Sequence, residues 1–291
     1  TQATVPTTTY AYDPAGNRTT AGGLTYTTNL LNQYTAVGGT AHSYDKSGNL
    51  TSDGSATYTW DFESRLTKVV KGTTTVTFAY DALGRRTSKT VNGTTTRYLY
   101  DGAHLLAETD TAGALTALYL FGPRLDEPLE MKRGTTTSSY SVDGLGSIVH
   151  LTDPTGTITE RYTYDPYGSP TIRNAAGAIL TTSAYKNLFL FTGRDWDSDT
   201  GLYFSRARYY SPTLGRFLSR DPLGQLPTPN LYTYAGNNPM NRVDPTGLMT
   251  QEDSQSSGGL FQEWWNRKFG DMIGGTYTGQ LTFVSPDGHV Y

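Results

Sequence analysis

Two aspartates are the residues whose pattern best suits catalysis. Asp221 and Asp244 stand 23 residues apart, and each is followed by a proline and, three positions on, by a glycine. Taken alone, an Asp-Pro-x-Gly segment is most simply a β-turn, because aspartate caps the turn and glycine supplies its positive φ. Two carboxylates held close together would do more. They would share one proton, so that one could activate a water molecule while the other protonated a leaving group.

The sequence offers little to other kinds of chemistry. The four histidines are scattered without metal-ligand spacing, cysteine is absent, and no phosphate-binding or dinucleotide-binding glycine motif occurs. We therefore expect no cofactor and no metal site. A net charge of −3 gives no basic footprint for nucleic acid. Four arginines interleaved with aromatic residues are interpreted as stacked and paired structural side chains: Arg206, Arg208, Arg216 and Arg220.

Strands must position these residues, because composition and periodicity both favour β structure. The chain is rich in Thr and Gly and contains 22 Tyr among 291 residues, which are strand and turn formers. Residues 75–80 and 96–100 alternate polar and apolar side chains, as half-buried strands do. A unit of the form aromatic-Asp-x-x-Gly-x-x-Thr recurs roughly every 20 residues, with eroded copies, and predicts stacked hairpins that share one sheet. Its copies begin at Tyr12, Tyr44, Trp60, Tyr80, Tyr100 and Tyr164.

The block from Leu188 to Met249 carries a second, ordered set of motifs. They are Gly201-Leu202-Tyr203, Arg206-Ala207-Arg208-Tyr209-Tyr210, Leu214 to Pro222, Asn230-Leu231-Tyr232-Thr233-Tyr234, Asn237-Asn238-Pro239 and Asp244-Pro245-Thr246-Gly247-Leu248. In this order, behind the repeats, they resemble the C-terminal end of the core domain in bacterial Rhs proteins. These proteins belong to the YD-repeat family, which includes toxin-complex shell components, wall-associated proteins and teneurins.

The resemblance implies an all-β fold in which YD-repeat hairpins form a sheet that spirals around a hollow interior, a β-cocoon or shell. Periodicity alone is equally compatible with a β-solenoid or meander without a cavity. Family shells contain many more repeats, so we expect the closing end of a shell or a small barrel-like cap. We predict a YD-repeat region over 1–187, the core block with its protease motif over 188–248, and a variable tail over 249–291.

The resemblance also assigns roles to the two aspartates. It implies that Asp221 and Asp244 form an aspartic-protease-like pair that cuts the chain once, between Leu248 and Met249. Arg220, next to Asp221 in the sequence, could keep one carboxylate ionised or orient the strand, and a surface or cavity-wall ion pair is the alternative interpretation. A bond so near one aspartate implies an intramolecular, single-turnover cut. One departure from the family is the loop after the first motif, where a glycine-rich segment is replaced by residues 225–229 with two prolines.

The tail after Met249 has no repeat signature. Residues 250–259 read as a linker. Apolar side chains at helical spacing predict an amphipathic helix over 260–273, and residues 276–291 predict a hairpin around Asp287-Gly288. The helix could plug the interior or touch a membrane, although packing against the shell is the favoured interpretation.

Two functions from different classes follow. The first is a shell fragment that encloses a C-terminal polypeptide, typically a toxin, and releases it by self-cleavage after Leu248. The second is a secreted or cell-surface structural protein, such as an adhesin or filament unit, without protease activity. A sugar-binding β protein is a third and weaker alternative. The expected partners are the chain's own tail or cargo, a secretion apparatus, or neighbouring subunits. The chain opens within its pattern and shows no signal peptide, so we expect it to be part of a longer bacterial protein exported by a dedicated system.

Overall fold

A five-residue turn centred on aspartate recurs along the chain and joins neighbouring strands. At Asp81 the backbone N–H donates to the carbonyl of Arg85 at 3.0 Å, and the N–H of Gly84 donates back to the carbonyl of Asp81 at 3.0 Å. The Asp81 carboxylate accepts the N–H groups of Leu83 and Arg85, each at 2.9 Å. Gly84 has a φ of 79°, a conformation that glycine adopts without strain. The same turn forms at Asp13, Asp45, Asp61, Asp110, Asp143, Asp153 and Asp165.

These turns join strands that pair antiparallel in chain order. The computed structural model describes residues 8–224, 230–248, 276–277 and 283–284. A five-stranded sheet contains β1 (Tyr10–Tyr12), β2 (Arg18–Ala21), β3 (Leu24–Thr28), β4 (Tyr34–Val37) and β5 (Thr40–Ala41). A fifteen-stranded sheet follows, in which every strand lies beside its sequence neighbours.

The strands of the larger sheet are β6 (Ser43–Tyr44), β7 (Leu50–Ser52), β8 (Ala56–Trp60), β9 (Leu66–Lys71), β10 (Thr74–Tyr80), β11 (Arg86–Val91), β12 (Thr94–Asp101), β13 (His104–Thr109), β14 (Leu115–Phe121), β15 (Pro128–Arg133), β16 (Thr136–Val142), β17 (Ile148–Thr152), β18 (Ile158–Tyr164), β19 (Pro170–Asn174) and β20 (Ile179–Leu180). Burial alternates along them as expected. In β10, Val76 and Phe78 are buried whereas Thr77 and Ala79 are exposed. The all-β hairpin prediction is therefore confirmed.

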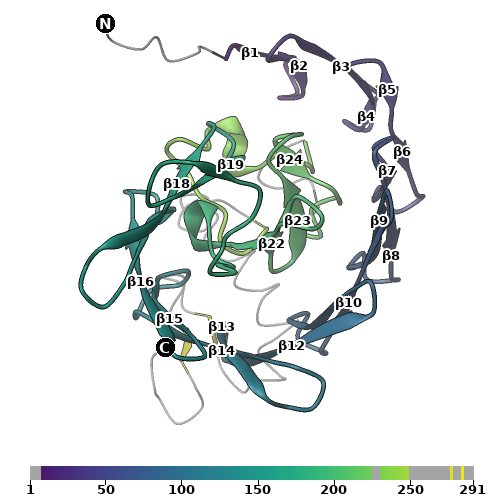
Figure 1. Cartoon of the computed structure of the whole chain (residues 1–291). Helices are drawn as coiled ribbons and strands as arrows, with labels where there is room; N and C mark the ends of the chain where they lie inside the picture. The colour runs from purple at the N-terminus through teal and green to yellow at the C-terminus, as the bar shows by residue number, and fades with distance from the viewer. Residues whose placement is uncertain (1–7, 225–229, 249–275, 278–282, 285–291) are drawn as a thin grey trace, which may run out of the picture.

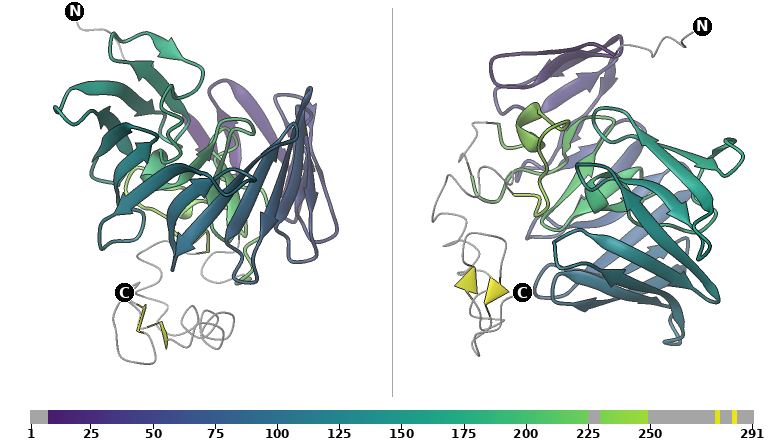
Figure 2. Two further views of the ribbon diagram at one scale, coloured as in Figure 1. Left: turned by 60° about the horizontal axis from the view of Figure 1, so that its bottom comes forward. Right: turned by 90° about the vertical axis from the view of Figure 1, so that its left-hand side faces the viewer.

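The two sheets curve around the last part of the described chain, which we call the central block (residues 188–248). Figure 1 shows the strands running in a spiral from β1 to β19, with β22, β23 and β24 inside it, and Figure 2 shows the same wrapping from the side. The block contains η1 (Phe191–Gly193), β21 (Asp195–Asp197), β22 (Leu202–Ser205), β23 (Arg208–Ser211), β24 (Arg216–Phe217) and η2 (Ala235–Asn237). Its strands form a separate four-stranded sheet.

Aromatic side chains from the curved sheet and the central block share one core. Tyr98, Tyr119 and Tyr162 on the sheet are buried in the same cluster as Tyr210 and Tyr234 of the block. The rings of Tyr210 and Tyr234 stack with centroids 4.2 Å apart. The inner face of the sheet is thus covered by the chain's own block, which is the arrangement of a closed end.

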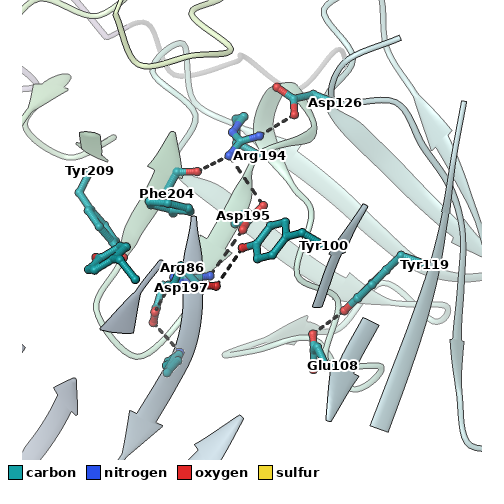
Figure 3. Close-up of polar contacts among 12 residues, drawn as sticks. Arg86, Tyr100, Glu108, Tyr119, Asp126, Arg194, Asp195, Asp197, Phe204 and Tyr209 are labelled. Atoms are coloured by element: carbon teal, nitrogen blue, oxygen red, sulfur yellow. Dashed lines mark hydrogen bonds and ion pairs between the residues drawn. The ribbon is translucent and has the colours of Figure 1, made fainter. Parts of the chain in front are cut away.

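A buried charge network joins the sheet to the block beside this core. The Arg86 guanidinium of β11 lies 3.5 Å from the carboxylate of Asp195 and 3.8 Å from that of Asp197, both on β21. Lys89 Nζ contacts Asp197 at 2.8 Å and Asp199 at 2.7 Å. Figure 3 shows Arg86 between the sheet and these carboxylates. Because the Arg86 side chain is 1% exposed, its charge depends on these partners.

The tail contributes one short strand pair to the described structure. β25 (Thr276–Tyr277) pairs antiparallel with β26 (Phe283–Val284). The predicted turn at Asp287-Gly288 lies outside the described residues. The expected helix over 260–273 lies outside the described residues. Within the described residues, no helix is long and apolar enough to cross a membrane.

Replacing Arg86 by alanine should destabilise the fold by roughly 3–5 kcal/mol, because it removes one counter-charge from the buried carboxylates of both Asp195 and Asp197. Its neighbour Arg85 is the matched control. Arg85 pairs with Asp81 at 2.7 Å in a turn where its side chain is 33% exposed, so Arg85→Ala should cost about 1 kcal/mol or less. Urea unfolding of both variants measures the difference. Equal losses would contradict a structural role for the buried network.

Candidate functional site

One arginine brings the two candidate catalytic aspartates together. Arg208 Nη2 lies 2.7 Å from Asp221 Oδ2 and 3.6 Å from Asp244 Oδ2. Because both carboxylates contact the same nitrogen, they are close neighbours in space despite their separation in sequence. Asp244 is buried and Asp221 nearly so, with side chains 3% and 11% exposed. The geometry thus places side by side the two carboxylates that the sequence predicts to act together.

Arg208 is held rigidly at the start of β23. Its guanidinium lies over the ring of Phe217 with the central carbon 3.7 Å from the ring centroid. Nη1 donates to the carbonyl of Leu231 at 2.9 Å, and Nε donates to the carbonyl of Gly247. A guanidinium has five N–H donors in a fixed plane, and here they are shared between the aspartates and two backbone segments.

The second aspartate sits in a tight turn that leads to Leu248. The N–H of Leu248 donates to Asp244 Oδ1 at 3.0 Å, and Ala207 N–H donates to the carbonyl of Thr246 at 3.2 Å. Gly247 has a φ of 72°, and a Cβ there would lie 2.2 Å from the carbonyl oxygen of Ser205. Only glycine fits this position. Leu248 itself is 3% exposed, so the chain leaves the site from a buried position.

Burial controls the protonation of the pair. Loss of solvent raises the pKa of the Asp244 carboxyl to about 7; Arg208 opposes this rise, and the neighbouring charge of Asp221 adds to it. Burial also raises the pKa of Asp221, again opposed by Arg208. Two adjacent carboxyls with raised pKa values titrate as a coupled pair. The arrangement can therefore hold a carboxylate and a carboxylic acid together near neutral pH, which is the requirement for paired acid and base catalysis.

Arg220, the residue expected to support Asp221, lies elsewhere. Its side chain is exposed and packs over Gly48, where an added Cβ would lie 2.3 Å from Arg220 Cδ. The guanidinium that contacts Asp221 belongs to Arg208. The sequence interpretation had Arg208 as a stacked and paired structural residue, and the stack on Phe217 agrees with that, but its link to both aspartates was missed. Met249 and the loop 225–229 lie outside the described residues.

No metal centre emerges from the described part of the chain, where no group of three or more His, Cys, Asp or Glu side chains is placed to hold an ion. The aspartate pair and Arg208 form the candidate site.

Comparison with known proteins identifies the family. A family model described as the teneurin YD-shell matches residues 1–240. The chain belongs to the teneurin YD-shell family. This confirms the Rhs and YD-repeat resemblance: the chain is a YD-shell protein related to toxin-complex components.

Similar proteins are much longer than this YD-shell chain. The tRNA nuclease WapA of Bacillus subtilis strain 168 is 39% identical over 255 residues, which cover 82% of this chain and 11% of that protein. The double-stranded DNA deaminase toxin A of Burkholderia cenocepacia is 29% identical over 208 residues, 62% of this chain and 14% of that protein. The chain thus spans about a tenth of the length of such relatives.

A solved structure confirms the fold of the YD-shell chain. The complex TcdB2-TccC3 without its hypervariable C-terminal region superimposes with a TM-score of 0.65, covering 83% of this chain and 13% of that chain at 23% sequence identity. At this identity the likeness concerns the fold.

The raised pKa of Asp244 predicts a pH-dependent stability. Its carboxyl titrates near 7 in the folded chain and near 3.9 in an unfolded one. Between these values the folded state keeps a proton that the unfolded state loses, so the stability falls as pH rises. Asp244→Asn removes this effect. We expect the variant to gain roughly 2–3 kcal/mol relative to the parent between pH 5 and pH 8.

Urea unfolding at several pH values measures this gain. The control is Asp153→Asn, in an exposed turn with the same Asp-Pro-Thr-Gly sequence, which should follow the parent over this range. A constant difference between Asp244→Asn and the parent would show that Asp244 is ionised throughout.

Proposed function

We propose that the chain is the closing end of a shell that encloses a C-terminal polypeptide and releases it by self-cleavage after Leu248. The observation that carries the proposal is the shared contact of Asp221 and Asp244 with Arg208 Nη2, at 2.7 and 3.6 Å. The candidate bond begins four residues after Asp244, whose carboxylate already accepts the Leu248 N–H. Asp244 and Leu248 thus belong to one buried turn, and Arg208 links Asp221 to it.

The roles of the two aspartates follow from their surroundings. The closer contact of Arg208 favours an ionised Asp221, whereas burial favours a protonated Asp244. In the proposed step Asp221 takes a proton from water as the oxygen attacks the Leu248 carbonyl carbon, and Asp244 protonates that carbonyl oxygen. The tetrahedral diol then collapses: one hydroxyl returns its proton to Asp244, the C–N bond to residue 249 breaks, and Asp221 gives its proton to the departing amine nitrogen. Water is the only co-reactant. After the cut, the turn contains no further bond to be cleaved, so each chain reacts once.

The cargo and its export are further parts of the proposal. The polypeptide after Leu248 would be enclosed by the longer shell to which this end belongs, and a secretion apparatus or neighbouring shell subunits would be its partners. The names of the Bacillus and Burkholderia relatives, a nuclease and a toxin, support a toxic cargo in proteins of this kind. We assign no activity to the tail of this chain.

A second function is favoured by the outer face of the sheet. Leu99, Leu118 and Leu120 are 50%, 40% and 57% exposed. Leu99 and Leu118 both lie opposite Ala107 in neighbouring strands, so they form an apolar strip across β12, β13 and β14. A strip of this kind suits contact with a neighbouring subunit in a secreted or cell-surface structural assembly.

Intact mass spectrometry under denaturing conditions tests the first function. The parent should give two fragments that meet between Leu248 and Met249. Asp221→Asn and Asp244→Asn should each give one full-length mass, because either change removes a carboxyl of the pair. Asp153→Asn is the matched control, since it alters an identical Asp-Pro-Thr-Gly turn away from the site, and it should be cut like the parent.

A full-length parent would reject self-cleavage and leave the structural-surface function in its place. Cleavage that persists in both site variants would reject the aspartate mechanism.

A further inference from the structure

We propose that Asp126, on the surrounding sheet, is a positioning residue for self-cleavage because it holds the Arg206 guanidinium against the carbonyl oxygen of Pro245. The inference rests on the proposed function. It adds a residue more than 90 positions away in sequence from Asp221 and Asp244, in a different part of the fold.

The loop between β14 and β15 places Asp126 against the central block. The N–H of Gly122 donates to the carbonyl of Glu127 at 2.8 Å, which closes the loop. Asp126 has a φ of 61°, and its side chain is 8% exposed. A Cβ on Gly193 of the block would lie 2.2 Å from the carbonyl oxygen of Asp126. The loop and the block therefore meet backbone to backbone.

Asp126 fixes the orientation of Arg206. Its Oδ1 accepts from Arg206 Nη2 at 2.6 Å and its Oδ2 accepts from Arg206 Nη1 at 3.0 Å. A two-point contact of this kind sets the plane of the guanidinium as well as its place. Arg206 Nη1 has a second hydrogen, and it also donates to the carbonyl of Pro245. The carboxylate thus aims that hydrogen at the turn that carries Asp244.

Through Arg194, the same carboxylate also anchors β22, the strand that precedes Arg206. Arg194 Nη1 contacts Asp126 Oδ1 at 2.5 Å, and Arg194 Nη2 donates to the carbonyl of Phe204 at 2.6 Å. Figure 3 shows Arg194 between Asp126 and Phe204. Burial raises the pKa of the Asp126 carboxyl, but Arg194 and Arg206 together outweigh it and lower the pKa below its usual value, which favours the carboxylate.

The contact positions the turn and does not create it. Residues 244–248 keep other bonds when Arg206 is released, namely Ala207 N–H to the carbonyl of Thr246 and Arg208 to the carbonyl of Gly247. Pro245 directly follows Asp244 within this turn, so the hydrogen bond to its carbonyl fixes where the Asp244 carboxyl lies relative to Leu248. A small misplacement of reacting groups is enough to slow a reaction severely.

Cell-free translation of the full chain, sampled over time by intact mass spectrometry, tests the proposal. Asp126→Asn keeps the shape of the side chain and suits the positive φ, but it removes the charge. We expect its cleavage to be about 10- to 100-fold slower than the parent's. Its thermal unfolding midpoint should also fall, because Arg194 and Arg206 lose their counter-charge, so both cleavage rates are compared at a temperature well below that midpoint.

Arg206→Gly gives a second test that does not depend on Asp126 variants folding. Arg206 has a φ of 51°, so glycine relieves the backbone while it removes the guanidinium. Millimolar guanidinium ion, far below the concentrations that unfold proteins, should restore cleavage of this variant. It should not restore cleavage of Asp221→Asn, which is the control for a general effect of the salt.

The outcomes separate the two proposals. Cleavage of Asp126→Asn at the parental rate, or no rescue of Arg206→Gly by guanidinium, would overturn the positioning role and leave self-cleavage standing. An uncut parent would overturn the proposed function and this inference with it.

Discussion

Every hairpin of this fold has an inward face that it cannot bury by itself. Stacking hairpins side by side satisfies the backbone, but it leaves the aromatic row on the inner face open to water. The central block supplies the missing cover, and buried arginines of both the sheet and the block make the contact between them specific. Arg86 is sandwiched between Tyr98 and Phe204 at 4.9 and 5.0 Å from their centroids, and Arg216 lies 3.4 Å from the centroid of Tyr34. Guanidinium groups suit this position, because they stack on rings while their N–H groups bond to carbonyls and carboxylates.

The candidate site depends on the same packing of the central block against the sheet. Arg208 is one of the stacked arginines of the block, yet its remaining donors reach Asp221, Asp244 and the carbonyl of Gly247. A side chain that closes the core therefore also joins the two carboxylates. This explains why a site suited to acid and base chemistry can be so deeply buried: the interior that excludes water from the core is the same interior that raises the pKa of Asp244.

Much of the fold was predictable from local sequence, because each hairpin is made by its own Asp turn and its own alternating strands. The site was predictable only through the family resemblance. The tetrapeptide Asp-Pro-Thr-Gly occurs at Asp153 and at Asp244, and in both places the carboxylate caps the N–H four residues on. One turn is exposed and the other is buried beside Arg208. Local spacing cannot tell them apart, and for the same reason it favoured Arg220, adjacent in sequence to Asp221, over Arg208, adjacent in space.

The strict chain order of the fifteen-stranded sheet has a consequence for biosynthesis. Each strand finds its partner in the segment made just before it, so the sheet can grow hairpin by hairpin as the nascent chain leaves the ribosome. Its aromatic inner face, however, remains exposed to solvent until residues 188–248 have been translated. Until then the incomplete sheet exposes a hydrophobic surface of the kind that chaperones recognise. For the same reason Arg208, Asp221 and Asp244 cannot come together until all three have been translated, so the candidate site forms only after the strands of the sheet have been made.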